Sequence, residues 1–150
     1  MNMTFRILRY VWAAPATAVG LAAAAAAICV GARPRVVRGV IEVGDGNFGR
    51  FMQFVPGFFR FEAITFGHVV LGRDHAALSC LREHERVHVR QYERWGLFFF
   101  PLYAGSSLWQ LLCGRDPYLH NAFEIEAFRV SDIVNVHHQS IGATENRNPL

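Results

Sequence analysis

The chain is 150 residues long, 52% of its residues are hydrophobic, and its net charge of +3 comes from arginine because it contains no lysine. This length allows one small domain. The arginines are scattered and many alternate with glutamate, instead of gathering on one face with aromatic residues between them, which argues against a nucleic-acid partner. The three cysteines form neither a CxxC motif nor a disulfide framework, so they indicate no particular compartment.

The first predicted element is an apolar helix. The segment from Val11 to Ala32 carries no charge and is long enough to cross a bilayer core of about 30 Å. Its length, and the aromatic residues Tyr10 and Trp12 near one interface, favour a retained transmembrane anchor. A signal peptide with Val30-Gly31-Ala32 before the cleavage site is the alternative. We therefore expect residues 1–33 to be a membrane anchor or a signal peptide.

The next segments predict a small sheet. Residues around Arg38-Gly39 are β-branched and indicate a short hairpin, with Val40–Val43 as its better strand. Residues 48–61 are rich in phenylalanine and glycine, and some of their apolar residues recur near helical spacing. Residues 63–71, AITFGHVVL, are apolar and β-rich and predict one further strand.

A helix of about twenty residues follows, from the N-cap residue Asp74 to Gly96. It carries the motif His84-Glu85-Arg86-Val87-His88. Two histidines four residues apart lie on one face of a helix, one turn from each other, at a separation that a zinc ion spans. The glutamate beside the first histidine is placed to deprotonate a metal-bound water. The motif predicts a metal site, with zinc as the expected ion.

A second apolar stretch, Leu97 to Cys113, decides whether this site can be completed. If the stretch crossed the membrane, the histidines and the acidic residues after it would lie about 30 Å apart, on opposite sides. As a helix it reaches only about 25 Å, and Pro101 and Gly105 weaken it. We expect it to fold back as a hairpin and to bring residues 121–129 beside the histidines.

The returning segment is thus residues 97–113, and the third ligand is expected after it, in residues 121–129, which contain Glu124 and Glu126. Residues two apart on a helix point about 200° away from each other, so only one of the two can face the metal. Helical geometry alone leaves both open. Gln91 and Tyr92 continue the histidine face and are expected to pack against the returning segment.

The motif HExxH, followed by Glu124-Ile-Glu126-Ala127, resembles the gluzincin zinc metallopeptidases, especially their membrane-associated branch of prenyl-protein and heat-shock proteases. The runs HERVHVRQYERWG, RDPY and NAFEIEAF are also similar to a family of small, uncharacterised bacterial membrane proteins, from the N-terminal segment to about Arg129. The resemblance implies His84, His88 and Glu124 as zinc ligands, Glu85 as general base, and a bacterial inner membrane as location.

One residue departs from the gluzincin pattern. The branch carries an aspartate after the alanine, where it supports a ligand histidine, and this chain has Phe128 there. Asp132, Asp116 or Asn121 could substitute for it.

Two further roles are expected around the metal. Tyr118 and His120 are candidate donors to the oxyanion that develops during hydrolysis. The strand ending at His68–Leu71 is expected to align an extended peptide substrate by β-augmentation.

Together these features predict an α+β fold: an N-terminal transmembrane helix and a small zincin-like domain over residues 34–136, with a short antiparallel sheet, and a polar tail over residues 137–150. The predicted function is a membrane-anchored zinc peptidase that hydrolyses peptide bonds with a metal-activated water, and its partners are a peptide or protein substrate and the lipid bilayer. The alternative is a non-catalytic membrane protein with a structural zinc site. A di-iron carboxylate site would need a second Glu-x-x-His, which the sequence lacks.

Overall fold

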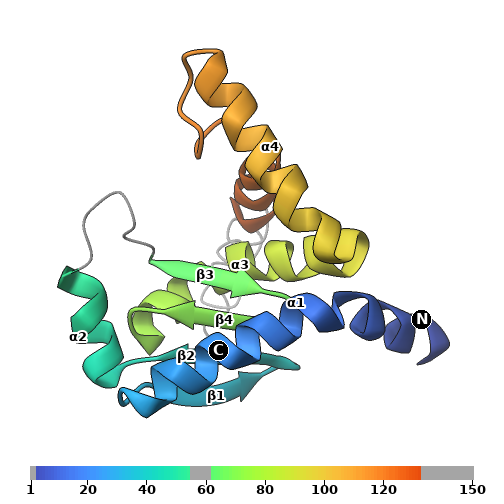
Figure 1. The fold of residues 1–150 in the computed structure, drawn as a ribbon. Helices are drawn as coiled ribbons and strands as arrows, with labels where there is room; N and C mark the ends of the chain where they lie inside the picture. The colour runs from blue at the N-terminus through green and yellow to red at the C-terminus, as the bar shows by residue number, and fades with distance from the viewer. Residues whose placement is uncertain (1–2, 55–61, 133–150) are drawn as a thin grey trace, which may run out of the picture.

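The structure is a computed structural model that describes residues 3–54 and 62–132. As predicted, the fold is α+β, and an apolar helix forms its N-terminal end (Figure 1). Its elements are α1 (Met3–Cys29), β1 (Arg33–Val37), β2 (Val40–Gly44), α2 (Gly46–Phe54), β3 (Ala63–Phe66), β4 (Val69–Gly72), α3 (His75–Trp95), the short 3-10 helix η2 (Gly96–Phe98) and α4 (Phe99–Leu112). A last helical stretch covers residues 122–132. The predicted tail, residues 137–150, and the aromatic residues of 55–61 lie outside the described residues.

The four strands form one mixed sheet in the order β1-β2-β4-β3. β1 and β2 form the predicted antiparallel hairpin, with Val37 opposite Val40. β2 and β4 are parallel, with Ile41 opposite Val69, so the prediction of an antiparallel sheet was wrong for the central pair. Between β2 and β4 the chain passes through α2 and the outer strand β3, and it then turns back so that β4 runs in the same direction as β2.

The segment predicted as one strand, residues 63–71, is a hairpin of two strands. β3 and β4 pair antiparallel, with Phe66 opposite Val69 across a two-residue turn. Gly67 in that turn has a φ of 58°, which glycine adopts without strain. A Cβ atom at Gly67 would also overlap Thr17 of α1. The turn therefore needs glycine both for its backbone conformation and for its close contact with α1.

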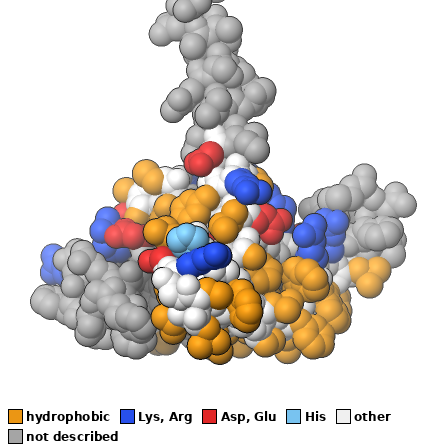
Figure 2. Space-filling model, turned by 90° about the horizontal axis from the view of Figure 1, so that it is seen from above, with side chains coloured by type: hydrophobic (Ala, Val, Ile, Leu, Met, Phe, Trp, Pro, Cys, Tyr) orange, Lys and Arg blue, Asp and Glu red, His pale blue; other side chains and the backbone are white. Residues whose placement is uncertain are grey.

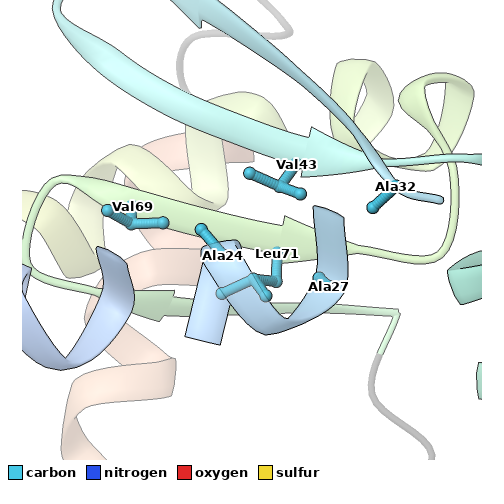
Figure 3. Close-up of a cluster of buried hydrophobic side chains, with 6 residues drawn as sticks. All are labelled: Ala24, Ala27, Ala32, Val43, Val69 and Leu71. Carbon is cyan, nitrogen blue, oxygen red and sulfur yellow. The ribbon is translucent and has the colours of Figure 1, made fainter. Parts of the chain in front are cut away.

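The sheet lies between two helices, α1 on one face and α3 on the other (Figure 1). α1 faces the sheet with small side chains at helical spacing, which let the helix approach closely. Ala24 and Ala27 point toward Val43, Val69 and Leu71 in the core (Figure 3). On the opposite face, Val40 and Val70 pack against Leu78 and Val89 of α3. Alternate residues of each strand thus supply two separate apolar layers.

A buried carboxylate connects the sheet to α3 through an ion pair. The side chain of Glu42, in β2, is 3% exposed and accepts hydrogen bonds from the guanidinium groups of Arg35 and Arg82. Burial alone would raise the pKa of Glu42, but the bonds from Arg82 and Arg35 outweigh it and lower the pKa. This charged cluster belongs to the α3 face of the sheet.

The predicted hairpin after α3 is present. Asp74 caps α3 by accepting a hydrogen bond from the Ala77 amide, and Gly96 ends it with a φ of 56°. The chain then turns through η2 into α4, which projects away from the sheet (Figure 1). Residues 115–121 lead back to the 122–132 helix. Tyr92 of α3 packs against Phe99 and Phe100, as expected for the returning segment.

Candidate metal centre

The two histidines of the HExxH motif lie on the buried face of α3. His84 and His88 are 6% and 7% exposed, and their ring centroids are 5.0 Å apart. Their Nε2 atoms approach to 3.3 Å. The helix therefore turns both rings so that the same nitrogen of each points to one place.

Glu124 reaches the same place from the 122–132 helix. One of its carboxylate oxygens lies 3.1 Å from Nε2 of His84, and the other lies 3.4 Å from Nε2 of His88. One donor atom from each of these three residues lies within 4.8 Å of the others, and all three residues are buried. Two imidazole nitrogens and a carboxylate are a donor set that binds divalent metals. This group can therefore hold a metal ion.

Asn121 fixes the start of the helix that carries Glu124. Its side-chain oxygen accepts a hydrogen bond from the amide of Phe123, as an N-cap residue does. Its side-chain nitrogen donates to the carbonyl of Tyr103 and to the hydroxyl of Ser107 on α4. Asn121 is completely buried. Glu124 thus sits in the first turn of a helix docked on α4, where the helix dipole favours a carboxylate.

Tyr103 holds the carboxylate of Glu124 from α4. Its hydroxyl donates to Oε1 of Glu124 at 2.6 Å. Burial would raise the pKa of Glu124, but the contacts with His84 and His88, followed by the Tyr103 bond, hold that pKa well below its usual range. Burial, and then the nearby Glu124, raise the pKa of Tyr103. The tyrosine therefore stays a neutral donor to an ionised carboxylate.

Glu85 lies on α3 between this group and the sheet. It is 6% exposed, and its Oε2 accepts a 2.7 Å hydrogen bond from the hydroxyl of Thr65 in β3. Burial lowers the pKa of His88, but nearby groups raise it overall, Glu124 most and Glu85 to a smaller extent. Glu85 is therefore close enough to His88 to influence its pKa. The carboxylate is therefore held beside the histidines and next to an edge strand.

The other candidates are placed differently. Glu126 does not join the three donors: its side chain is 46% exposed, and it accepts a hydrogen bond from Gln91. Tyr118 lies near the site, with its ring 6.2 Å from that of Phe128. Tyr118 is 47% exposed, and its partial burial, followed by the charges of Glu124 and Glu85, raises its pKa. His120 is exposed in the connecting loop beside Asp116, so the structure does not bring it to the donors.

Three residues could have substituted for the missing aspartate: Asp132, Asp116 and Asn121. Within the part of the chain that the structure describes, none of them forms a side-chain hydrogen bond with His84 or His88. Phe128, in the aspartate's place, packs its ring 4.7 Å from that of His84. Asp116 instead accepts from the amides of Tyr118 and Leu119. The polar partner of a ligand histidine is Gln91, whose Oε1 lies 2.8 Å from Nδ1 of His88. A residue on the same helix thus takes the place expected for the aspartate.

Tyr103 was missed in the sequence, although a signal for it exists. Within the apolar segment of α4, Tyr103, Ser106, Ser107 and Gln110 follow the spacing of one helix face. Three of these side chains contact the 122–132 helix or its cap residue. A polar face on an otherwise apolar helix marks the side that meets polar groups of another segment.

No protein-family model, curated protein or solved structure matches this chain.

Proposed function

We propose that the protein is a zinc-dependent peptidase, with His84, His88 and Glu124 as the zinc ligands. The convergence of three buried donor atoms from two separate helices is the observation that carries this proposal. Three protein ligands of the types His, His and Glu are the set found in catalytic zinc sites, which leave a fourth position for water. Zinc, when bound there, polarises a water molecule and lowers its pKa.

Each remaining role falls to a residue around the three donors. Thr65 holds Oε2 of Glu85, which leaves Oε1 to accept a proton as the general base. Tyr118, whose raised pKa keeps it protonated, is the proposed donor to the oxyanion of the substrate carbonyl. Tyr103 keeps the carboxylate of Glu124 oriented.

The proposed substrate is an extended peptide that pairs with β3. The strand predicted for this role, residues 63–71, is the hairpin of β3 and β4, and β4 is hydrogen-bonded to β2 on one side and β3 on the other, so it has no free edge for a peptide. β3 is the terminal strand of the described sheet and carries Thr65, which contacts Glu85. A peptide added to this edge by β-augmentation would run close to the general base.

Metal content and hydrolysis, measured on purified protein, test the proposal. We expect about one zinc ion per chain, lost in His88→Ala and kept in Glu85→Gln. Digestion of a peptide library, read by mass spectrometry, should show cleavage by the wild type and none by Glu85→Gln. Wild-type protein that takes up no zinc from a zinc-containing buffer would overturn the metal site. Equal cleavage by Glu85→Gln would overturn the assignment of the base.

A structural zinc site is the second candidate, and one observation favours it. All three donor residues and Glu85 are no more than 7% exposed. A closed structural site carries a fourth protein ligand and admits no water. A hydroxamate inhibitor, which needs the open position, separates the two: it should shift the spectrum of a cobalt-substituted peptidase and leave that of a closed site unchanged.

We also propose that the protein associates with a membrane, as the bacterial family that it resembles implies. α1 is long and apolar enough to span a bilayer, a property that signal sequences and core helices share. The outer faces of α1 and α4 are apolar, with Val11, Trp12, Trp109 and Leu112 all at least 50% exposed. Hydrophobic side chains gather along the lower edge of Figure 2, the side on which α1 lies in front of the sheet in Figure 1. Contiguous apolar surfaces of this kind mark membrane or protein contacts.

The packing of α1 favours an orientation along the membrane surface. Ala13, Ala16 and Ala24 lie against the rest of the protein with at most 3% exposure. The Thr17 hydroxyl accepts from the His68 amide, and Tyr10 stacks on the His68 ring at 4.1 Å. If α1 crossed the bilayer in this arrangement, the sheet and its buried Glu42 cluster would enter the hydrocarbon, which is costly for charged groups. We therefore propose that α1 lies in the interface with only its outer face in lipid.

A further inference from the structure

The side chain of Gln91 connects three parts of the candidate metal centre. Gln91 lies on α3 one turn after His88 and is 2% exposed. Its Oε1 lies 2.8 Å from Nδ1 of His88. Its Nε2 lies 3.0 Å from the carbonyl oxygen of Phe123 and 2.9 Å from Oε2 of Glu126, both in the 122–132 helix. Every polar atom of this amide is therefore engaged.

These partners fix which way the amide points. A carbonyl oxygen and a carboxylate accept hydrogen bonds, so the side-chain nitrogen of Gln91 must face Phe123 and Glu126. Its oxygen must then face His88. An oxygen can only accept, so Nδ1 of His88 must carry the hydrogen of that bond. The remaining ring nitrogen, Nε2, is the atom that lies 3.3 Å from Nε2 of His84 and 3.4 Å from Glu124.

We propose that Gln91 is a positioning residue that holds His88 with its proton on Nδ1 and its Nε2 lone pair toward the metal. Neutral histidine binds a metal through one nitrogen, and the hydrogen bond at the other nitrogen decides which one. Glu126 supports this role, because it orients the amide of Gln91; it is not itself a metal ligand. The inference rests on the proposed metal site and names the residues that prepare it.

The same contacts link the ligand on α3 to the helix that carries Glu124. Gln91 can orient His88 only while Phe123 and Glu126 hold its nitrogen, which requires the 122–132 helix to be docked. Docking of that helix brings in Glu124 at the same time. The orientation of one ligand and the arrival of another therefore depend on the same interface.

Zinc affinity, measured by competition with a chromophoric chelator, tests the role of Gln91. Gln91→Leu removes the acceptor and is expected to weaken zinc binding by about 10- to 100-fold, the usual cost of losing a partner of a ligand histidine. Gln91→Glu alone would set two carboxylates together, so it is combined with Glu126→Gln, which restores a donor to residue 91; this double variant keeps an oxygen at Nδ1 and should recover most of the affinity that Gln91→Leu loses. Gln110→Leu, the same substitution on α4, serves as the matched control and should leave the affinity unchanged.

Nitrogen-15 NMR of the histidine rings gives a readout that a simple packing role would not affect. In the zinc-loaded wild type, His88 should show a protonated Nδ1 and a zinc-bound Nε2. Coordination of zinc through Nδ1 of His88 would overturn the inference, whether or not the variants fold. So would wild-type affinity in a folded Gln91→Leu, or an affinity of the folded double variant no higher than that of Gln91→Leu. A wild type that binds no zinc would instead defeat the proposed function itself.

Discussion

Tyr103 and Glu124 show how single side chains prepare the candidate site. Their hydrogen bond, at 2.6 Å, joins a half-buried tyrosine to a carboxylate that also contacts both histidines. Hydrogen bonds to charged acceptors are short and strong, and they fix the direction of the acceptor's lone pairs. Glu124 is therefore presented in one orientation, with its two oxygens divided between the rings of His84 and His88.

Replacing Tyr103 by phenylalanine should weaken zinc binding by about tenfold or more, because it removes the donor that orients Glu124. Chelator competition at neutral pH measures the change. The control is Tyr92→Phe, which alters a buried tyrosine that packs against Phe99 and Phe100 outside the donor group. Equal losses in both variants would show that the effect is one of packing and not of the bond to Glu124.

Zinc affinity should also depend on pH through His88. Burial lowers the pKa of His88, but the contacts with Glu124, Glu85 and Gln91 together outweigh it, so the pKa of His88 in the metal-free protein is raised. Protons therefore compete with zinc at higher pH than for an ordinary histidine, and affinity should rise as the pH rises through the raised value. The raised pKa of His88 also stabilises the metal-free protein, with the opposite pH dependence. This contribution to the free energy of unfolding is fully present below the pKa of His88 in the unfolded state, and it is lost as the pH rises through the pKa of His88 in the folded state.

Chelator competition from about pH 5 to about pH 9, with proton release followed in a weakly buffered solution, measures this linkage. Zinc binding should release a proton at a pH below the His88 pKa. An affinity that stays constant across the range would contradict the assignment of His88 as a ligand whose proton is displaced.

The histidine pair and its helix were predictable because their signals are local. Asp74, Gly96 and the four-residue spacing of His84 and His88 all act within one helix. The roles of Gln91 and Tyr103 were not predictable in the same way. Each depends on atoms supplied by the 122–132 helix, and the relative placement of two helices is set by packing between distant segments.

At the scale of elements, α1 is a structural layer of the domain. Its inner face is made of small residues, and Gly20 lies close to the sheet: a Cβ there would lie 2.7 Å from the carbonyl oxygen of Phe66 and 2.8 Å from Cβ of Val69. The apolar composition of this segment predicted a membrane anchor. The same composition fits a helix that buries one face on a sheet, and composition alone does not distinguish the two uses.

Gly20→Val should destabilise the protein by roughly 2–3 kcal/mol or more, because the added side chain overlaps backbone and core atoms of β3 and β4. Ala22→Val, two residues further on the exposed face of α1, is the matched control. Urea unfolding followed by circular dichroism compares the two. Equal stability of both variants would show that α1 is not packed on the sheet in solution.

The sheet was predicted in part for a similar reason. The β1–β2 hairpin depends on a turn at Arg38 and Gly39, which have φ angles of 46° and 81° and follow one another in the sequence. The parallel pairing of β2 with β4 joins strands that are separated by α2. No nearby residue encodes that pairing, so it could be found only from the folded chain.

At the scale of the whole molecule, two apolar helices present outward faces while their inner faces hold the domain together. α1 covers the sheet, and α4 supports the helix that carries Glu124. An interfacial α1 keeps both of its ends on one side of the membrane, whereas a spanning α1 separates them. On the proposed membrane association, the contacts between α1 and the sheet favour the first arrangement.

Cys29, at the end of α1, provides a native probe of this arrangement because its side chain is exposed. In a Cys80→Ser, Cys113→Ser background, a membrane-impermeant maleimide and a protease acting on an N-terminal tag can be applied to sealed membrane vesicles that contain the protein. Both sites should react from the same side. Reaction from opposite sides would show that α1 crosses the bilayer and that its contacts with the sheet are not kept in the membrane.

The positions of the donors along the chain have a last consequence for the hairpin that contains α4. His84 and Glu124 are 40 residues apart in sequence. An ion held between them would act as a removable cross-link closing that loop, and a covalent link of this length stabilises a protein by about 4 kcal/mol. Chelation would then loosen α4 and the 122–132 helix while leaving the sheet and α1 in place. The supply of metal would then set the stability of this part of the molecule.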